Sequence, residues 1–98
     1  MPPVIWTPNA LRGVRRVYRF LAEKDMDAAK TMAALLFKQA EILENFPNSG
    51  RPATDLEPEH RELLIPFGSS GYVLLYRFDE DRAAVTVMAV RHQKEIGY

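Results

Sequence analysis

The sequence contains no cysteine, which excludes disulfide bridges and thiolate zinc sites and favours a reducing cytoplasm as the location. No apolar run approaches the roughly 20 residues that a bilayer-spanning helix needs. The segment Met1–Val4 lacks the basic region and apolar stretch of a signal peptide. Net charge is absent too, since 13 basic side chains balance 13 acidic ones. This balance argues modestly against a protein that mainly grips phosphate backbones, because such binding is largely electrostatic.

What the sequence does contain is typical of a small globular protein. Its 98 residues, 47% hydrophobic and 27% charged, predict a single domain spanning residues 1–98. The two histidines, His60 and His92, do not make a metal site by themselves, because such a site needs several converging ligands. We therefore expect neither a metal nor a cofactor.

The first part of the chain predicts a short strand followed by a helix. Val4–Trp6 is an apolar run too brief for a helix. Thr7 is a suitable N-cap, and Pro8 fits the first helical position, where its missing N–H removes no hydrogen bond. The helix should end near residues 23–25. Its apolar stripe consists of Leu11, Val14, Val17, Tyr18, Phe20 and Leu21.

Two further features of this helix suggest contacts beyond it. Gly13 weakens the helix by about 1 kcal/mol relative to alanine, so it is a candidate for a close approach of another backbone. Several arginines recur at helical spacing on the face opposite the apolar stripe. A solvated face is their usual explanation, but their concentration raises the chance that they meet an acidic segment of a partner protein. They are Arg12, Arg15, Arg16 and Arg19.

A second helix should follow, capped by Asp25 or Asp27 and running to about Asn45. Its apolar arc is wide, which predicts a helix covered on more than one side. Either the sheet and the first helix bury this arc fully, or a partner covers the remainder. The arc consists of Ala28, Ala29, Met32, Ala33, Leu35, Leu36, Ala40, Ile42, Leu43 and Phe46.

Turn signals divide the rest of the chain into three strands. Residues 47–52 form a turn cluster that ends the second helix, and residues 53–60 form an acidic loop. Arg61 opens the first strand. Two polar turns, at residues 68–71 and 79–82, then separate it from the second strand and the second from the third.

Composition indicates where these strands lie in the sheet. Tyr72–Phe78 shows no clean alternation, so we expect a central strand that is buried on both faces. Pro66 cannot donate a ladder hydrogen bond and therefore places its strand at an edge or at a bulge. The order of elements predicts an α+β fold, β-α-α-β-β-β, with two N-terminal helices packed on a mainly antiparallel sheet.

Four motifs, taken in order, carry a family resemblance. They are Pro-Asn-Ser-Gly-Arg-Pro at residues 47–52, Arg61 at a strand start, Gly-Tyr-Val-Leu-Leu-Tyr-Arg at residues 71–77, and Val-Arg-His-Gln-Lys at residues 90–94. Together they resemble the RelE/ParE superfamily, the toxins of type II toxin–antitoxin systems. The resemblance covers nearly the whole chain. It implies a RelE/ParE-like toxin domain that inhibits growth and is neutralised by a cognate antitoxin.

This superfamily has two mechanisms. RelE-like members cleave mRNA in the ribosomal A site, using basic side chains on the sheet and near the C-terminus. ParE-like members have no established nuclease chemistry, and those characterised act on DNA gyrase. The resemblance therefore implies either a nuclease or a protein that acts by binding.

Most of the groups that the RelE pattern implies are missing here. When the pattern is aligned through the glycine-serine turn, its strand lysines fall on Leu64 and Pro66 and its strand arginine on Val73. Its C-terminal arginine falls on Gln93, and its terminal tyrosine lies near Tyr98. RNA cleavage needs a base, an acid and positive charge at the phosphate, which leucine, proline and valine cannot supply. The sequence thus favours the ParE-like reading, with DNA gyrase as the target.

Basic side chains near the strand ends are the candidates for target contacts. On the ParE-like reading these are Arg61, Arg91, His92 and Lys94, while the arginines of the first helix bind the antitoxin. Structural roles are also open. Arg61 could pair with the acidic loop, and His92 could bond to backbone or to water.

Two alternatives complete the set of hypotheses. The protein could be a ribosome-dependent mRNA endonuclease whose rearranged site lies around Arg61, Arg77 and His92, with the ribosome and mRNA as partners. His92 would then supply a group that titrates near neutral pH. It could instead be a decayed toxin that only binds its antitoxin. The sequence leaves open whether the protein is an enzyme.

Overall fold

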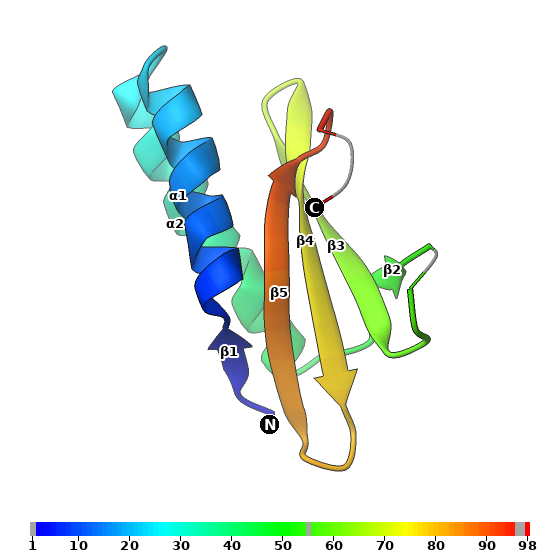
Figure 1. Cartoon of the computed structure of the whole chain (residues 1–98). Helices are drawn as coiled ribbons and strands as arrows, with labels where there is room; N and C mark the ends of the chain where they lie inside the picture. The colour runs from blue at the N-terminus through cyan, green and yellow to red at the C-terminus, as the bar shows by residue number, and fades with distance from the viewer. Residues whose placement is uncertain (1, 55, 96–97) are drawn as a thin grey trace.

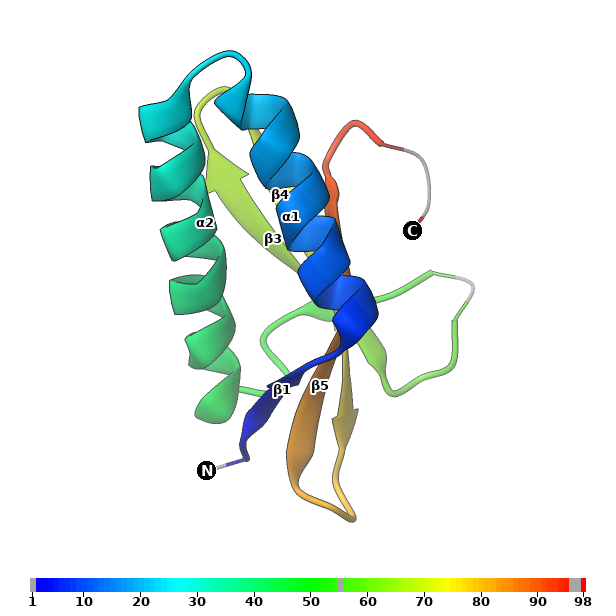
Figure 2. The ribbon, with the colours of Figure 1, turned by 60° about the vertical axis from the view of Figure 1, so that its left-hand side comes forward.

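Two helices cover one face of a five-stranded sheet, as the two ribbon views show (Figure 1 and Figure 2). The structure is a computed structural model and describes residues 2–54, 56–95 and 98. It confirms the α+β order expected from the sequence. The elements are β1 (Val4–Trp6), α1 (Pro8–Ala22), α2 (Met26–Ala40), the 3₁₀ helix η1 (Glu41–Glu44), β2 (Arg51–Pro52), β3 (His60–Phe67), β4 (Ser70–Asp79) and β5 (Ala84–His92).

The strand order across the sheet is β1-β5-β4-β3-β2, and all neighbours are antiparallel except the parallel pair of β1 and β5. β4 is the middle strand, as expected, and Tyr72–Tyr76 are all buried, but the expected burial does not extend to exposed Arg77 and half-buried Phe78. The short strand β2 was not predicted, and it pairs only with Arg61 and Glu62. Beyond Glu62 one side of β3 is therefore a sheet edge, where Pro66 lies as expected.

The two faces of the sheet differ in what covers them. On the helix face, side chains of both helices and of β3, β4 and β5 form the main core. On the opposite side, here called the outer face, Leu75 belongs to a smaller apolar cluster with Ala53 and Ala89. The largest fully buried members of the main core are Tyr76, Met32, Leu36, Leu43, Ile65, Leu74, Val85 and Val87.

A β-bulge in β5 changes which of its residues face the helices. The pairing of β4 with β5 shifts between Leu75 and Tyr76, which leaves Met88 as the extra residue. Val87 before the bulge and Val90 after it both lie in the main core. The last residues of β5 therefore point to the faces opposite to those that strict alternation would give them.

α1 begins as expected and lies unusually close to β5. The Thr7 hydroxyl accepts a hydrogen bond from the Ala10 N–H at 3.1 Å, and Pro8 is the first helical residue. A Cβ atom at Gly13 would lie only 2.8 Å from the carbonyl oxygen of Val90. The close backbone approach suggested by this glycine is thus confirmed.

α2 begins where expected but ends earlier. The Asp25 side chain accepts from the Ala28 N–H at 3.0 Å, which confirms its capping role. The α-helix ends at Ala40 instead of near Asn45, and the chain continues in η1. Such 3₁₀ turns are frequent at helix ends, where the last carbonyl groups lack α-helical partners. Leu43 in η1 still reaches the main core.

The wide apolar arc of the second helix is only partly covered. Ile42 is 39% exposed, and Phe46, just after η1, is 63% exposed. Full burial by the sheet and the first helix is therefore wrong for this chain by itself. Among the described residues, no helix is both long and apolar enough to cross a membrane.

Candidate functional site

The basic residues singled out in the sequence lie at two ends of the sheet. His60 pairs with Arg77 at one end, while Tyr72 pairs with His92 at the other. Arg77 and Tyr72 are five positions apart on β4, which separates the two ends by about 17 Å. Arg61 directly follows His60 and therefore lies at the same end of the sheet as Arg77. The structure therefore does not bring Arg61, Arg77 and His92 into one site.

Arg61 holds the turn that precedes β3. Its Nη1 donates to the Gly50 carbonyl at 2.8 Å, and among the described residues it forms no ion pair with the acidic loop. The Gly50 N–H donates to the hydroxyl of buried Tyr76 at 2.9 Å, and this hydroxyl donates to the Pro47 carbonyl at 2.7 Å. A Cβ atom at Gly50 would lie 2.7 Å from the Tyr76 ring, which accounts for the glycine in this turn. Arg61 is thus part of a structural clamp.

At the same end, Arg77 approaches Glu59 with 3.8 Å between Nε and Oε1. A backbone hydrogen bond and the Glu57 side chain, with a smaller effect of Arg77, lower the pKa of Glu59 below its ordinary value. Glu57, Glu59 and His60 place ligand atoms within 4.8 Å of one another. The neighbouring guanidinium of Arg77 opposes a cation there, because like charges repel.

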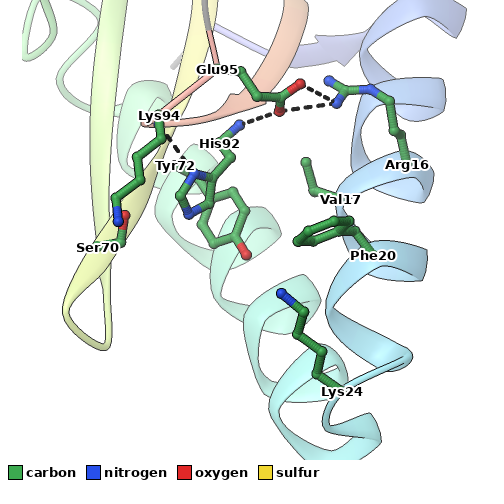
Figure 3. A pocket seen from close by; sticks show the side chains of 9 residues that line it. All are labelled: Arg16, Val17, Phe20, Lys24, Ser70, Tyr72, His92, Lys94 and Glu95. Carbon is green, nitrogen blue, oxygen red and sulfur yellow. Dashed lines mark hydrogen bonds and ion pairs between the residues drawn. The ribbon is translucent and has the colours of Figure 1, made fainter.

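The other end of the sheet carries a hollow, here called the α1 groove, of about 630 Å³ between α1 and the ends of β4 and β5 (Figure 3). Its apolar part comes from Val17 and Phe20 of α1 and from Tyr72 of β4. Burial raises the pKa of the Tyr72 hydroxyl, so this group stays protonated at neutral pH. The remaining lining residues are Arg16, Lys24, Ser70, His92, Lys94 and Glu95.

Glu95 connects α1 to the end of β5. It accepts from Arg16 Nη1 at 2.7 Å and from the His92 backbone N–H at 2.8 Å (Figure 3). The His92 ring packs edge-on against Tyr72 with 5.2 Å between ring centroids, and its Nδ1 accepts from the Lys94 N–H at 3.1 Å. His92 therefore makes a hydrogen bond to the backbone, as the hypothesis of a structural role for this residue expected.

Arg91 lies on the other side of the sheet from His92. Its Nη1 donates to the carbonyl groups of His92, Gln93 and Glu95 at 3.3, 3.2 and 3.0 Å. Its Nη2 lies 3.9 Å from the carboxylate of Glu62 on the outer face. The four candidate target-binding residues are thus divided, with His92 and Lys94 at the α1 groove, Arg91 on the outer face and Arg61 at the far end.

The positions that correspond to the RelE strand groups lie together on the outer face. Leu64 is directly opposite Val73, and Val73 is in turn opposite Arg91. Leu64 is 46% exposed, whereas Val73 is buried. The Tyr98 hydroxyl donates to the carboxylate of Glu62 nearby. This face therefore presents apolar strand residues beside Arg91, whose guanidinium is already held by Glu62 and by backbone carbonyl groups.

The arginines of α1 are exposed as expected, but they have different surroundings. Arg16 turns toward Glu95 and the Val90 carbonyl, whereas Arg12, Arg15 and Arg19 lie exposed along the helix. Phe20, which the periodicity placed in the apolar stripe, is 65% exposed at the edge of the α1 groove. The groove was not predicted from the sequence. The available signal was Lys24 four residues after Phe20, since its Nζ lies 4.3 Å from the Phe20 ring centroid.

A family model described as "ParE toxin of type II toxin-antitoxin system, parDE" matches residues 4–97. Among curated relatives, Toxin RelE3 of Caulobacter vibrioides is 34% identical over 90% of each chain. Toxin RelE1 of the same organism is 36% identical over 76% of each chain. The Putative toxin Y4kP of Sinorhizobium fredii is 31% identical over 90% of this chain and 88% of its own length.

Two solved structures share the fold. A chain of the "Chromosomal ParDE TA system from P. aeruginosa" matches with a TM-score of 0.76 and 16% identity, over 94% of this chain and 96% of that one. A chain of the "intact E. coli RelBE toxin-antitoxin complex" matches with a TM-score of 0.63 and 18% identity, over 97% and 100%.

Fold, motifs and relatives together define a toxin of the RelE/ParE superfamily from a type II toxin–antitoxin system. The chain belongs to the ParE toxin family, whose model it matches over nearly its whole length. The resemblance seen in the sequence is thereby confirmed. The family model carries the ParE name, whereas two of the three relatives carry the RelE name, so the molecular target does not follow from the names.

Proposed function

We propose that this toxin inhibits growth by binding DNA gyrase, without cleaving RNA, and that a cognate antitoxin neutralises it. The observation that carries the proposal is the chemistry of the outer face. Leu64 and Val73 stand side by side where the RelE pattern has a lysine and an arginine. Neither side chain can move a proton or stabilise a phosphorane.

The remaining basic groups support the same conclusion, because they do not converge. Arg61 is held by the Gly50 carbonyl, and Arg91 by three carbonyl groups and Glu62. Arg77 and His92 lie at opposite ends of β4. General acid–base catalysis needs both groups within hydrogen-bond reach of one phosphate, about 3 Å. This arrangement suits a binding surface better than a nuclease site.

An acidic antitoxin segment fits the exposed cations of α1. Arg12, Arg15 and Arg19 point to solvent from one helix, and an acidic partner would neutralise their mutual repulsion. The two solved structures of the same fold have titles that name toxin–antitoxin systems, which supports a partner of this kind.

The test is a supercoiling assay with purified gyrase, relaxed plasmid and the purified toxin. We expect loss of supercoiling and accumulation of cleaved plasmid, both reversed by prior addition of the antitoxin. A second reaction with a topoisomerase of another class controls for general effects on DNA. Normal supercoiling at a high molar excess of toxin would overturn the proposal.

Ribosome-dependent mRNA cleavage is the second candidate, and the names of the relatives favour it, since two of them are called RelE toxins. Toeprinting of translating ribosomes tests it directly. Cleavage within the A-site codon that disappears in the double variant Arg61→Ala with His92→Ala, provided that this variant is still folded without the Arg61–Gly50 contact, would support this candidate. Intact mRNA, or cleavage that the double variant leaves unchanged, would count against it.

A further inference from the structure

The α1 groove combines an apolar floor with a basic rim. Val17, Phe20 and Tyr72 face one another across the hollow, and cationic side chains surround them (Figure 3). Phe20 is 65% exposed, although it borders an apolar hollow. An exposed apolar surface rimmed by polar groups is typical of an interaction site. The rim cations are Arg16, Lys24 and Lys94.

Charge is distributed unevenly along the chain, and the helix α1 beside this groove carries an excess of positive charge. The chain as a whole is neutral, but residues 8–24 hold five basic side chains and one acidic side chain, a local net charge of +4 (5 − 1). The rest of the chain therefore carries a compensating net charge of −4. Opposite potentials guide association and disfavour wrong partners, so the complementary partner of this face is acidic.

One carboxylate already occupies the rim. Glu95 is the acidic member of the groove lining, and it pairs with Arg16 at 2.7 Å. The two side chains are 41% and 52% exposed, respectively. An ion pair in such contact with water contributes about 0.2–1 kcal/mol, so a carboxylate from a partner can replace it at little cost.

We propose that the α1 groove binds a segment of the antitoxin that carries a bulky apolar side chain between carboxylates, and that one of these carboxylates replaces Glu95 at Arg16. The apolar side chain packs on Phe20 and Tyr72, while the other carboxylates lie near the rim lysines. This inference rests on the proposed function only in taking the antitoxin as the partner.

A single-stranded nucleic acid also carries negative charge and flat rings, but it fits less well. Bases need a free flat aromatic face for stacking, whereas an aliphatic side chain can also pack on a ring edge. Lys24 Nζ already lies over the Phe20 ring, 4.3 Å from its centroid. Tyr72 meets the His92 ring edge-on, which uses a second aromatic contact within the protein. The observations therefore favour a peptide.

An NMR titration of the full chain labelled with ¹⁵N tests the inference. The probes are a synthetic peptide with leucine and phenylalanine anchors among glutamates, the same peptide with lysines for glutamates, the same peptide with serines for the anchors, and a short oligothymidylate. We expect the first probe alone to shift the amide signals of Phe20, Tyr72 and His92. Binding of the lysine peptide or the oligothymidylate at the groove in its place would overturn the inference.

Variants sharpen the test. Phe20→Ala should abolish binding of the acidic peptide, whereas Phe46→Ala, a matched control at 63% exposure away from the groove, should not change it. Glu95→Gln keeps Oε1 as an acceptor for the His92 N–H and for Arg16 but removes the charge that competes for Arg16, so it should tighten binding by up to roughly fivefold. Unchanged or weaker binding by Glu95→Gln would contradict the exchange. Because no gyrase is present, failure here leaves the proposed target untouched, and failure in the supercoiling assay leaves the groove result untouched.

Discussion

A single hydroxyl group fixes the turn that precedes β3. Tyr76 is completely buried, and its hydroxyl both accepts from Gly50 and donates to Pro47. Buried polar groups cost free energy when their partners are removed, because water cannot replace them. The Pro-Asn-Ser-Gly-Arg-Pro motif is therefore kept in place by a side chain that lies 26 residues beyond Gly50.

Removing this hydroxyl should destabilise the fold. Tyr76→Phe leaves the Gly50 N–H without its partner, so we expect the free energy of unfolding to fall by about 1–3 kcal/mol. Tyr18→Phe is the control, because among the described residues the Tyr18 hydroxyl donates only to the exposed Met26 sulfur. This variant should change stability by less than about 0.5 kcal/mol. Urea unfolding measures both. Equal stability of the two variants would contradict the clamp.

For the variant Gly13→Ala, helix propensity and packing should change the free energy of unfolding in opposite directions. Propensity alone makes Gly13→Ala stabilising by about 1 kcal/mol. The new Cβ atom would lie 2.8 Å from the Val90 carbonyl oxygen, however, so α1 must move away from β5. We expect a net loss of about 1–3 kcal/mol, measured by urea unfolding. Gly68→Ala, with positive φ but open space, should cost only the backbone strain of about 1 kcal/mol.

Among the elements, α1 has four distinct surfaces. Val14 and Val17 face the core, Gly13 allows close contact with β5, and Phe20 lies at the groove. The exposed arginines occupy the rest of the helix. One helix thus contributes to stability, to sheet contact and to both proposed antitoxin contacts.

Charge reversal on α1 should weaken antitoxin binding without unfolding the toxin. Arg15→Glu with Arg19→Glu changes the local charge by four units, so we expect at least a tenfold loss of affinity, corresponding to about 1.4 kcal/mol. Arg82→Glu, at an 85% exposed side chain in the turn between β4 and β5, is the control. Titration calorimetry at two salt concentrations measures both. Equal affinities of the two variants would exclude the arginines of α1 as an antitoxin surface.

For the whole molecule, burial of tyrosines predicts how stability depends on alkaline pH. Burial raises the pKa of Tyr72 and Tyr76 above the ordinary value of 10.0. The unfolded chain therefore loses these protons first as the pH rises. Their contribution to stability is complete below about pH 10 and is lost as the pH rises toward the folded-state pKa.

The variant Tyr72→Phe isolates this effect. Among the described residues the Tyr72 hydroxyl forms no hydrogen bond, so the variant should match the wild type at pH 7 within about 0.5 kcal/mol. Between about pH 9 and pH 11 its free energy of unfolding should fall less steeply than that of the wild type. Parallel urea titrations at each pH measure the two slopes. Identical slopes would show that Tyr72 does not contribute.

Much of the fold was predictable because local chemistry specifies it. Thr7 and Pro8 set the start of α1, Asp25 caps α2, and the lack of alternation in Tyr72–Phe78 identifies the central strand. The two-residue strand β2 was missed, because so short a segment has no periodicity and forms only by pairing with β3.

The candidate site was less predictable. The sequence allowed Arg61, Arg77 and His92 to form one nuclease site. The strand register instead places His92 at the end of the sheet opposite to the other two residues. Phe20 satisfied the helical period and still lies exposed, because it borders the open α1 groove and is not packed against the sheet.

By itself the sequence determined the order of the elements, the superfamily and the apolar residues at the RelE positions, since all of these depend on local composition and on motifs. Only the tertiary structure decided which side chains meet. The extra residue Met88 reverses the alternation of β5, so Arg91 turns to the outer face and His92 to the α1 groove. The physical reason is that side chains of a strand alternate with a period of two, so one inserted residue exchanges the two faces for everything beyond it.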